Sequence, residues 1–160
     1  MPGADWSVRR ADALKNLEGL KNLRLYAFQV TGKGMEAFTA SIAVHNTSLQ
    51  ALALVACGLK AAAKYYKPLA AALPQLTGLT SLHLQEVDMF LQDGQEYAAA
   101  LVPGLMKLQN LRVLDMAGHA ASTCTAPLVT ALSAHPALRR VVLDSGSCQF
   151  DQNYPCLVLQ

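Results

Sequence analysis

A short pattern of hydrophobic positions recurs along the chain. It has the form apolar-x-x-apolar-x-apolar and begins at residues 20, 49, 79, 111 and 138, in steps of 29, 30, 32 and 27 residues. The second occurrence reads Leu49-Gln-Ala-Leu52-Ala-Leu54. Alternation of apolar and other residues at the end of the pattern is typical of a strand with one buried face. Nearly constant spacing predicts a repeat architecture.

A second apolar pattern precedes the strands. Ahead of Leu79 and Leu111, leucines stand about ten, six and three positions upstream: Leu69, Leu73, Leu76 and Leu101, Leu105, Leu108. Spacings of three and four residues predict an amphipathic helix before each strand. Pro68, Pro103 and Pro127 are expected at or near the helix starts, where proline is best tolerated. The repeating unit is therefore a strand, a turn, a helix and a turn.

This unit resembles the leucine-rich repeat family, and its length of about 28–30 residues is similar to the ribonuclease-inhibitor-like branch. The resemblance covers roughly residues 8–148 and is best at 49–59, where Cys57 occupies the family's Asn or Cys position. In the other units that position holds Phe28, Val87, His119 and Gly146. The resemblance implies an α/β solenoid, with a short curved parallel sheet on the concave side and helices on the convex side.

The repeat also suggests how the chain is divided. Residues 1–19, with Trp6 and an expected helix over 9–17, form an N-terminal cap or a partial first repeat. Residues 20–148 hold the repeats, and residues 149–160 form a closing segment or the point where a longer array is cut. Tyr154–Leu159 is expected to be a shortened closing strand. Stacked units share one leucine core, so several units are needed for stability.

Composition removes several classes of function. The 160 residues include 13 Lys+Arg and 11 Asp+Glu, and the net charge of +2 is too small to suggest nucleic acid or an anionic membrane as partner. No apolar run is long enough to span a membrane, and no signal peptide precedes the first unit. We therefore expect a cytoplasmic or otherwise intracellular protein. Its four cysteines, Cys57, Cys124, Cys148 and Cys156, are then expected to be free thiols, with two disulfides as the alternative for a secreted chain.

No residue pattern points to catalysis or to a cofactor. The four histidines lack metal-ligand spacing, and His45 and His135 are expected to cap or pack at helix ends. Thr31-Gly-Lys-Gly34 lacks the frame of a phosphate loop and is read as a turn. We therefore predict no enzyme activity, no metal, no cofactor and no small-molecule substrate.

The residues that alternate with the apolar strand positions point to the concave side. They form a mixed surface of charged, polar and small apolar side chains, and parallel sheets are usually covered on both faces. The concave face is therefore a candidate surface for docking another protein. The alternative is a solvated face whose small residues permit tight curvature. The candidate binding residues are Arg24, Tyr26, Ala53, Val55, His83, Gln85, Asp115, Arg140 and Asp144.

The leading functional hypothesis is a non-catalytic interaction module or scaffold, a subunit or adaptor that docks through its concave face or its flank. A second hypothesis is a regulatory unit acting on an enzyme, such as a GTPase regulator or a ubiquitin-ligase substrate receptor, as in some members of the family. A third is the sensor-end fragment of a larger receptor, suggested by the apolar end at Leu159.

Overall fold

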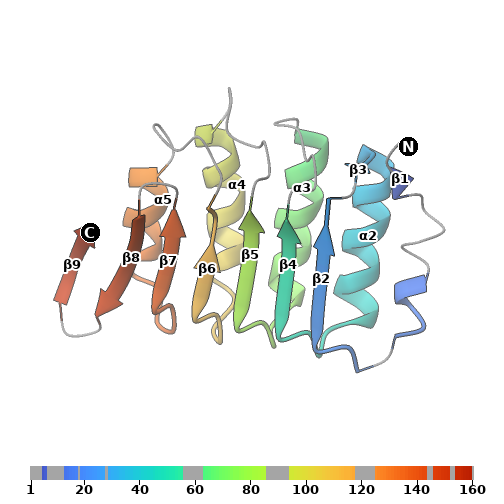
Figure 1. Cartoon of the computed structure of the whole chain (residues 1–160), viewed down its shortest axis with the longest axis horizontal. Helices are drawn as coiled ribbons and strands as arrows, with labels where there is room; N and C mark the ends of the chain where they lie inside the picture. The colour runs from blue at the N-terminus through green and yellow to red at the C-terminus, as the bar shows by residue number, and fades with distance from the viewer. Residues whose placement is uncertain are drawn as a thin grey trace.

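The computed structural model describes residues 5–6, 13–17, 19–27, 29–55, 63–85, 94–117, 125–143, 146–151 and 154–159. Five consecutive strands of the sheet are parallel: β2 (Asn22–Tyr26), β4 (Ala51–Val55), β5 (Ser81–Gln85), β6 (Val113–Asp115) and β7 (Arg140–Leu143). The helices between them are α2 (Gly32–His45), α3 (Ala63–Ala72) with the short 3₁₀ helix η1 (Leu73–Gln75), α4 (Gly94–Leu105) and α5 (Thr125–Leu132). The strands form one layer and the helices a second layer (Figure 1). The predicted α/β solenoid is therefore confirmed.

The repeats are stacked in register. Leu23, Leu52, Leu82, Leu114 and Val141 are opposite one another on successive strands. All but the first of these side chains are buried, and Leu23 on the edge strand β2 is half-buried. Each strand rises about 3.3 Å per residue with alternating side chains, so one shared register points a complete row of apolar residues toward the helices.

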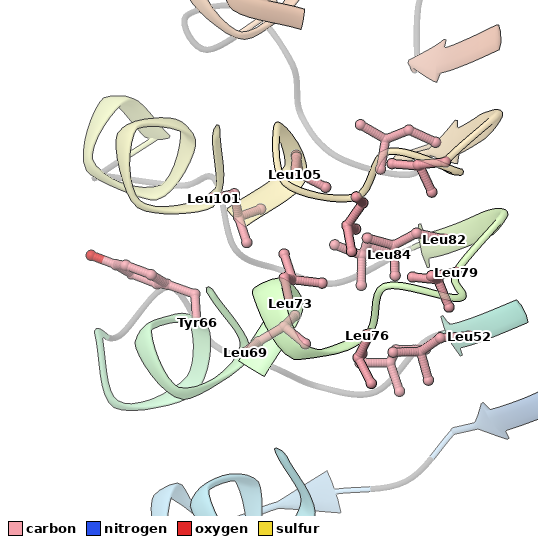
Figure 2. Packing of buried hydrophobic residues seen from close by; sticks show 14 of the residues in the cluster. Leu52, Tyr66, Leu69, Leu73, Leu76, Leu79, Leu82, Leu84, Leu101 and Leu105 are labelled. Atoms are coloured by element: carbon pink, nitrogen blue, oxygen red, sulfur yellow. The ribbon is translucent and has the colours of Figure 1, made fainter. Parts of the chain in front are cut away.

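The helices complete a core in which leucine is the main residue type. Figure 2 shows Leu69 and Leu73 of the α3 segment and Leu101 and Leu105 of α4 pointing toward the strand leucines. Full burial of a leucine stabilises the fold by about 1.5–3 kcal/mol. Tyr66 adds a polar link, because its hydroxyl lies 3.3 Å from Oε2 of Glu96 on the next helix.

The helix starts differ from the sequence expectation. Pro68 and Pro103 lie inside α3 and α4, so their predicted placement at or near helix starts is wrong. Pro127 is the third residue of α5. The expectation failed because leucines mark only the part of the helix that faces the sheet. Helix α4 begins at Gly94, well before Leu101, and ends before Leu108.

The close packing of α4 against α3 requires a glycine at position 104. A Cβ built on Gly104 of α4 would lie 3.0 Å from the backbone oxygen of Ala70 on α3. That distance leaves almost no room for a side chain between a helix and the backbone of its neighbour.

Both ends of the solenoid are built differently from the repeats. At the N-terminal end, β1 (Asp5–Trp6) pairs in parallel with β3 (Gln29–Val30) in a separate two-stranded sheet. Leu14 belongs to the main core, but of the helix expected over 9–17 the described residues show helical conformation only at 13–14. At the other end, β8 (Gly146–Asp151) pairs antiparallel with β7, and β9 (Tyr154–Leu159) pairs antiparallel with β8. A strand at 154–159 was expected, whereas β8 and the antiparallel direction were not.

Several sequence expectations fall on residues that the structure does not describe. Of the Asn/Cys ladder positions, Phe28, Cys57, Val87 and His119 lie outside the described residues, and Gly146 begins β8. The side chains of Cys57, Cys124, Cys148 and Cys156 are also outside them, so their oxidation state stays a prediction.

Two buried polar side chains join neighbouring units, and they stand at equivalent positions three residues before a strand pattern. The Asn46 amide donates to the Leu17 backbone oxygen at 3.0 Å. His135 Nε2 lies 3.1 Å from the Leu105 backbone oxygen, and its Nδ1 accepts from the Leu138 N–H at 3.1 Å. This pattern requires the neutral imidazole with the proton on Nε2. Burial lowers the pKa of His135, and the hydrogen bond to Leu105 opposes that shift in part.

Candidate functional site

The concave face is organised in rows, because the five parallel strands share one register. The first row is Asn22, Ala51, Ser81, Val113 and Arg140, and the second is Arg24, Ala53, His83, Asp115 and Val142. Tyr26, Val55 and Gln85 form a third row. The structure thus brings eight of the nine predicted site residues onto one face, while Asp144 lies outside the described residues.

The middle of this face carries a chain of polar contacts. Ser81 Oγ lies 2.7 Å from His83 Nε2, and His83 Nδ1 lies 3.3 Å from Asp115 Oδ2. The same carboxylate accepts from the Gln85 amide at 2.6 Å and, through Oδ1, from the Ala117 backbone N–H at 3.0 Å. A neutral imidazole that donates a hydrogen bond from Nδ1 to Asp115 has no proton on Nε2, so Nε2 accepts a hydrogen bond from the Ser81 hydroxyl. These contacts fix four side chains across two strands before any partner binds.

Partial burial strengthens this polar chain. The side chains of His83 and Asp115 are 25% and 13% exposed. A carboxylate with so little exposure needs its hydrogen bonds, because an unpaired buried charge is costly. Asp115 is therefore a fixed acceptor at the centre of the face, and His83 is the more exposed of the two side chains.

The β2 end of the face presents an aromatic side chain to solvent. Tyr26 is 56% exposed, and the Arg24 guanidinium carbon lies 5.5 Å from the centre of its ring. The next residue, Ala27, has φ of 47°, and its N–H donates to the Val55 oxygen at 2.9 Å. A non-glycine residue in the left-handed region costs about 1 kcal/mol or more, and such strain is common at binding sites. The hydrogen bond to Val55 holds the chain in this strained conformation directly after Tyr26.

The predicted site residues are not equally accessible. Ala53 is only 5% exposed, because it lies between the longer side chains of Arg24 and His83 in the second row. Its contribution to a binding surface is therefore small. Val55 is half-buried, and Arg140 is exposed at the opposite end of the face from Tyr26.

Sequence reasoning missed the contacts within this face. Ser81 is not among the predicted site residues, and His83 and Asp115 are 32 residues apart in the chain. The available signal was the repeat itself. His83 and Asp115 both stand four residues after a pattern start, at 79 and 111, so neighbouring strands bring them together.

The order Ser81, His83, Asp115 is also the order of a nucleophile, a base and an orienting carboxylate. Acyl chemistry needs in addition hydrogen-bond donors aimed at the oxygen where negative charge develops. In the central strands the neighbouring backbone N–H groups are engaged in the parallel ladder. Among the described residues, no group of three or more His, Cys, Asp or Glu side chains is placed to hold a metal ion.

The convex side offers a second surface. Helices α2 and α3 border an open hollow of about 590 Å³; half of its lining residues are alanines, and Glu36 and Lys67 are among the others. Near it, Val44 is 69% exposed on α2. In the part of the chain that the structure describes, no helix has the length and apolar character needed to cross a bilayer.

The architecture defines a solenoid of the leucine-rich repeat type with an open concave sheet. A solved structure of similar fold is the tropomodulin C-terminal domain from Caenorhabditis elegans, with a TM-score of 0.68 over 86% of this chain and 82% of that one. The sequence identity is 14%, so the similarity concerns the fold. No protein-family model and no curated protein matches the sequence.

Proposed function

We propose that this protein is a non-catalytic interaction module that docks another protein on its concave face, as a subunit or adaptor of a larger assembly. The observation that carries this proposal is the combination of the exposed Tyr26 with the pre-formed Ser81–His83–Asp115–Gln85 contacts on one open sheet. Tyrosine and arginine are enriched at the energetically important points of protein interfaces. Side chains fixed in advance lower the entropy cost of binding.

The similar solved structure is compatible with this role. It is described as a C-terminal domain, so there the fold is one part of a longer chain. We further propose that the repeats belong to the ribonuclease-inhibitor-like branch, on the basis of their spacing and of the helix in each complete unit. The proposed contact residues are Arg24, Tyr26, Val55, His83, Gln85, Asp115 and Arg140, with Asp144 proposed on sequence alone.

A photo-crosslinking experiment tests the docking face. The photoreactive residue p-benzoylphenylalanine replaces Tyr26 in one variant and Val44 in a matched control, because both side chains are large, apolar and exposed. Irradiation in an extract of the source cells, followed by mass spectrometry, identifies the adducts. A specific protein attached at position 26 and absent at position 44 is expected.

The other outcomes contradict the proposal in different ways. Adducts at position 44 alone would assign docking to the convex side, near the hollow between α2 and α3. Absence of specific adducts at both positions, with both variants folded by circular dichroism, would argue against an interaction module.

A further inference from the structure

Three arginines, Arg112, Arg139 and Arg140, lie where β6 and β7 begin, at the edge of the sheet formed by the amino-terminal ends of its parallel strands. The Arg139 and Arg140 N–H groups both donate to the Arg112 oxygen, at 2.9 and 3.0 Å. Arg112 and Arg139 therefore occupy neighbouring positions directly before two adjacent strands, and adjacent strands are about 4.8 Å apart. All three side chains are exposed, and none forms an ion pair with a carboxylate of the described residues.

The two edge arginines border a hollow. It has a volume of about 380 Å³ and is lined by Gln109, Asn110, Arg112, Pro136, Ala137 and Arg139. The Asn110 amide donates to the Thr77 oxygen and the Gln109 amide to the Met106 oxygen, each at 3.0 Å. The loop before β6 thus holds two polar side chains in fixed positions beside Arg112, and the loop before β7 adds Pro136 and Ala137 to the lining.

Placing like charges side by side on neighbouring strands destabilises a sheet unless an opposite charge is supplied. No carboxylate of the described residues forms an ion pair with these arginines, so an acidic ligand would meet a concentrated positive charge at this edge. The planar guanidinium group matches a carboxylate with two parallel hydrogen bonds, and two adjacent guanidinium groups can hold more than one acidic side chain.

We infer that this arginine edge, consisting of Arg112, Arg139 and Arg140 with the adjoining hollow, binds an acidic peptide segment of the protein partner. The inference rests on the proposed function and specifies the chemistry of the partner. Arg140 also belongs to the first row of the concave face, beside Val113, so a segment held at the edge continues onto the docking surface.

The surroundings favour a peptide over a nucleic acid. Binding a nucleic-acid backbone relies on many phosphate contacts, whereas this edge offers three cations on a chain of net charge +2. Single-stranded nucleic acids also need aromatic rings on which bases stack. Among the side chains that the structure describes on the concave face, the exposed tyrosine is Tyr26, and it lies on β2 at the far end of the sheet from β7.

Fluorescence anisotropy with a fluorescein-labelled deca-glutamate peptide tests the inference on the full chain. The test variant is Arg112→Gln/Arg139→Gln, and the matched control is Lys33→Gln/Lys67→Gln. Each pair removes two exposed cations and lowers the net charge from +2 to 0, but the lysines lie on α2 and α3. Deca-lysine and a 20-nucleotide single-stranded DNA serve as comparison ligands.

The wild type and the lysine variant are expected to bind deca-glutamate equally, and the arginine variant at least tenfold more weakly. Binding should weaken as salt is raised from about 50 to 200 mM, because the contacts are exposed ion pairs. Equal binding by the arginine variant, or no binding by the wild type, would overturn the inference. Tighter, arginine-dependent binding of the DNA would replace it with a nucleic-acid site. The proposed function is tested separately, since adducts at position 26 do not depend on these arginines.

Discussion

Truncation of one core leucine tests the stacked register directly. Leu82 lies at the middle of the sheet, fully buried between Leu52 and Leu114 on the neighbouring strands. Replacing it with alanine leaves a cavity that the neighbours cannot fill, because the strand ladders fix their backbones. Buried leucine-to-alanine changes cost about 2.7–5.0 kcal/mol, and we expect about 3–4 kcal/mol at this site.

Leu23 provides a matched control within the same molecule. It occupies the same register position on β2, but this edge strand has a neighbour on one side only and the side chain is half-buried. Leu23→Ala should therefore cost about 1–2 kcal/mol, since less apolar area is lost from the core.

Thermal unfolding followed by circular dichroism measures the difference. For a chain of this size each kcal/mol corresponds to about 2–4 °C, so Leu82→Ala should lower the Tm by about 6–16 °C. The decrease for Leu23→Ala should be about half as large or less. If the edge substitution destabilised the protein as much as the central one, the shared core along the solenoid would be refuted.

Two further predictions concern the polar side chains. Burial lowers the pKa of His135 in the folded state below the ordinary histidine pKa of about 6.5. As the pH falls through 6.5, the unfolded state therefore binds a proton at His135 before the folded state does. The free energy of unfolding decreases as the pH falls from about 6.5 toward the pKa of the folded state. The equivalent position of the central units is leucine, so urea unfolding at pH 7.5 and 5.5 should show a smaller decrease for His135→Leu than for the wild type. An equal decrease in both proteins would assign the pH dependence to other groups. Ser81 should not react with a fluorophosphonate probe under conditions that label a serine hydrolase. Labelling of Ser81 that is lost in His83→Ala would contradict the non-catalytic proposal.

Local sequence predicted the repeating elements because the information lies within each unit. The inward residues, such as Leu52, Leu82 and Leu114, share one position in the pattern, and neighbouring units in any parallel stack place them together. The same logic assigned Tyr26, His83 and Asp115 to the outward face. The alternation of side chains in a strand is a property of the backbone and needs no knowledge of the neighbours.

The contacts between residues of neighbouring repeats were decided only by the tertiary structure. Three features depend on residues about thirty positions apart in the chain. They are the contact of His83 with Asp115, the burial of Ala53 between Arg24 and His83, and the backbone hydrogen bond from Arg139 to Arg112. The strand β8 and the antiparallel pairing of β8 and β9 do not follow the repeat and were likewise not predicted by the pattern. A periodic sequence therefore determines the elements and their faces, because these follow from local geometry. The tertiary structure determines which side chains touch, because that depends on the register between strands and on the size of each neighbour.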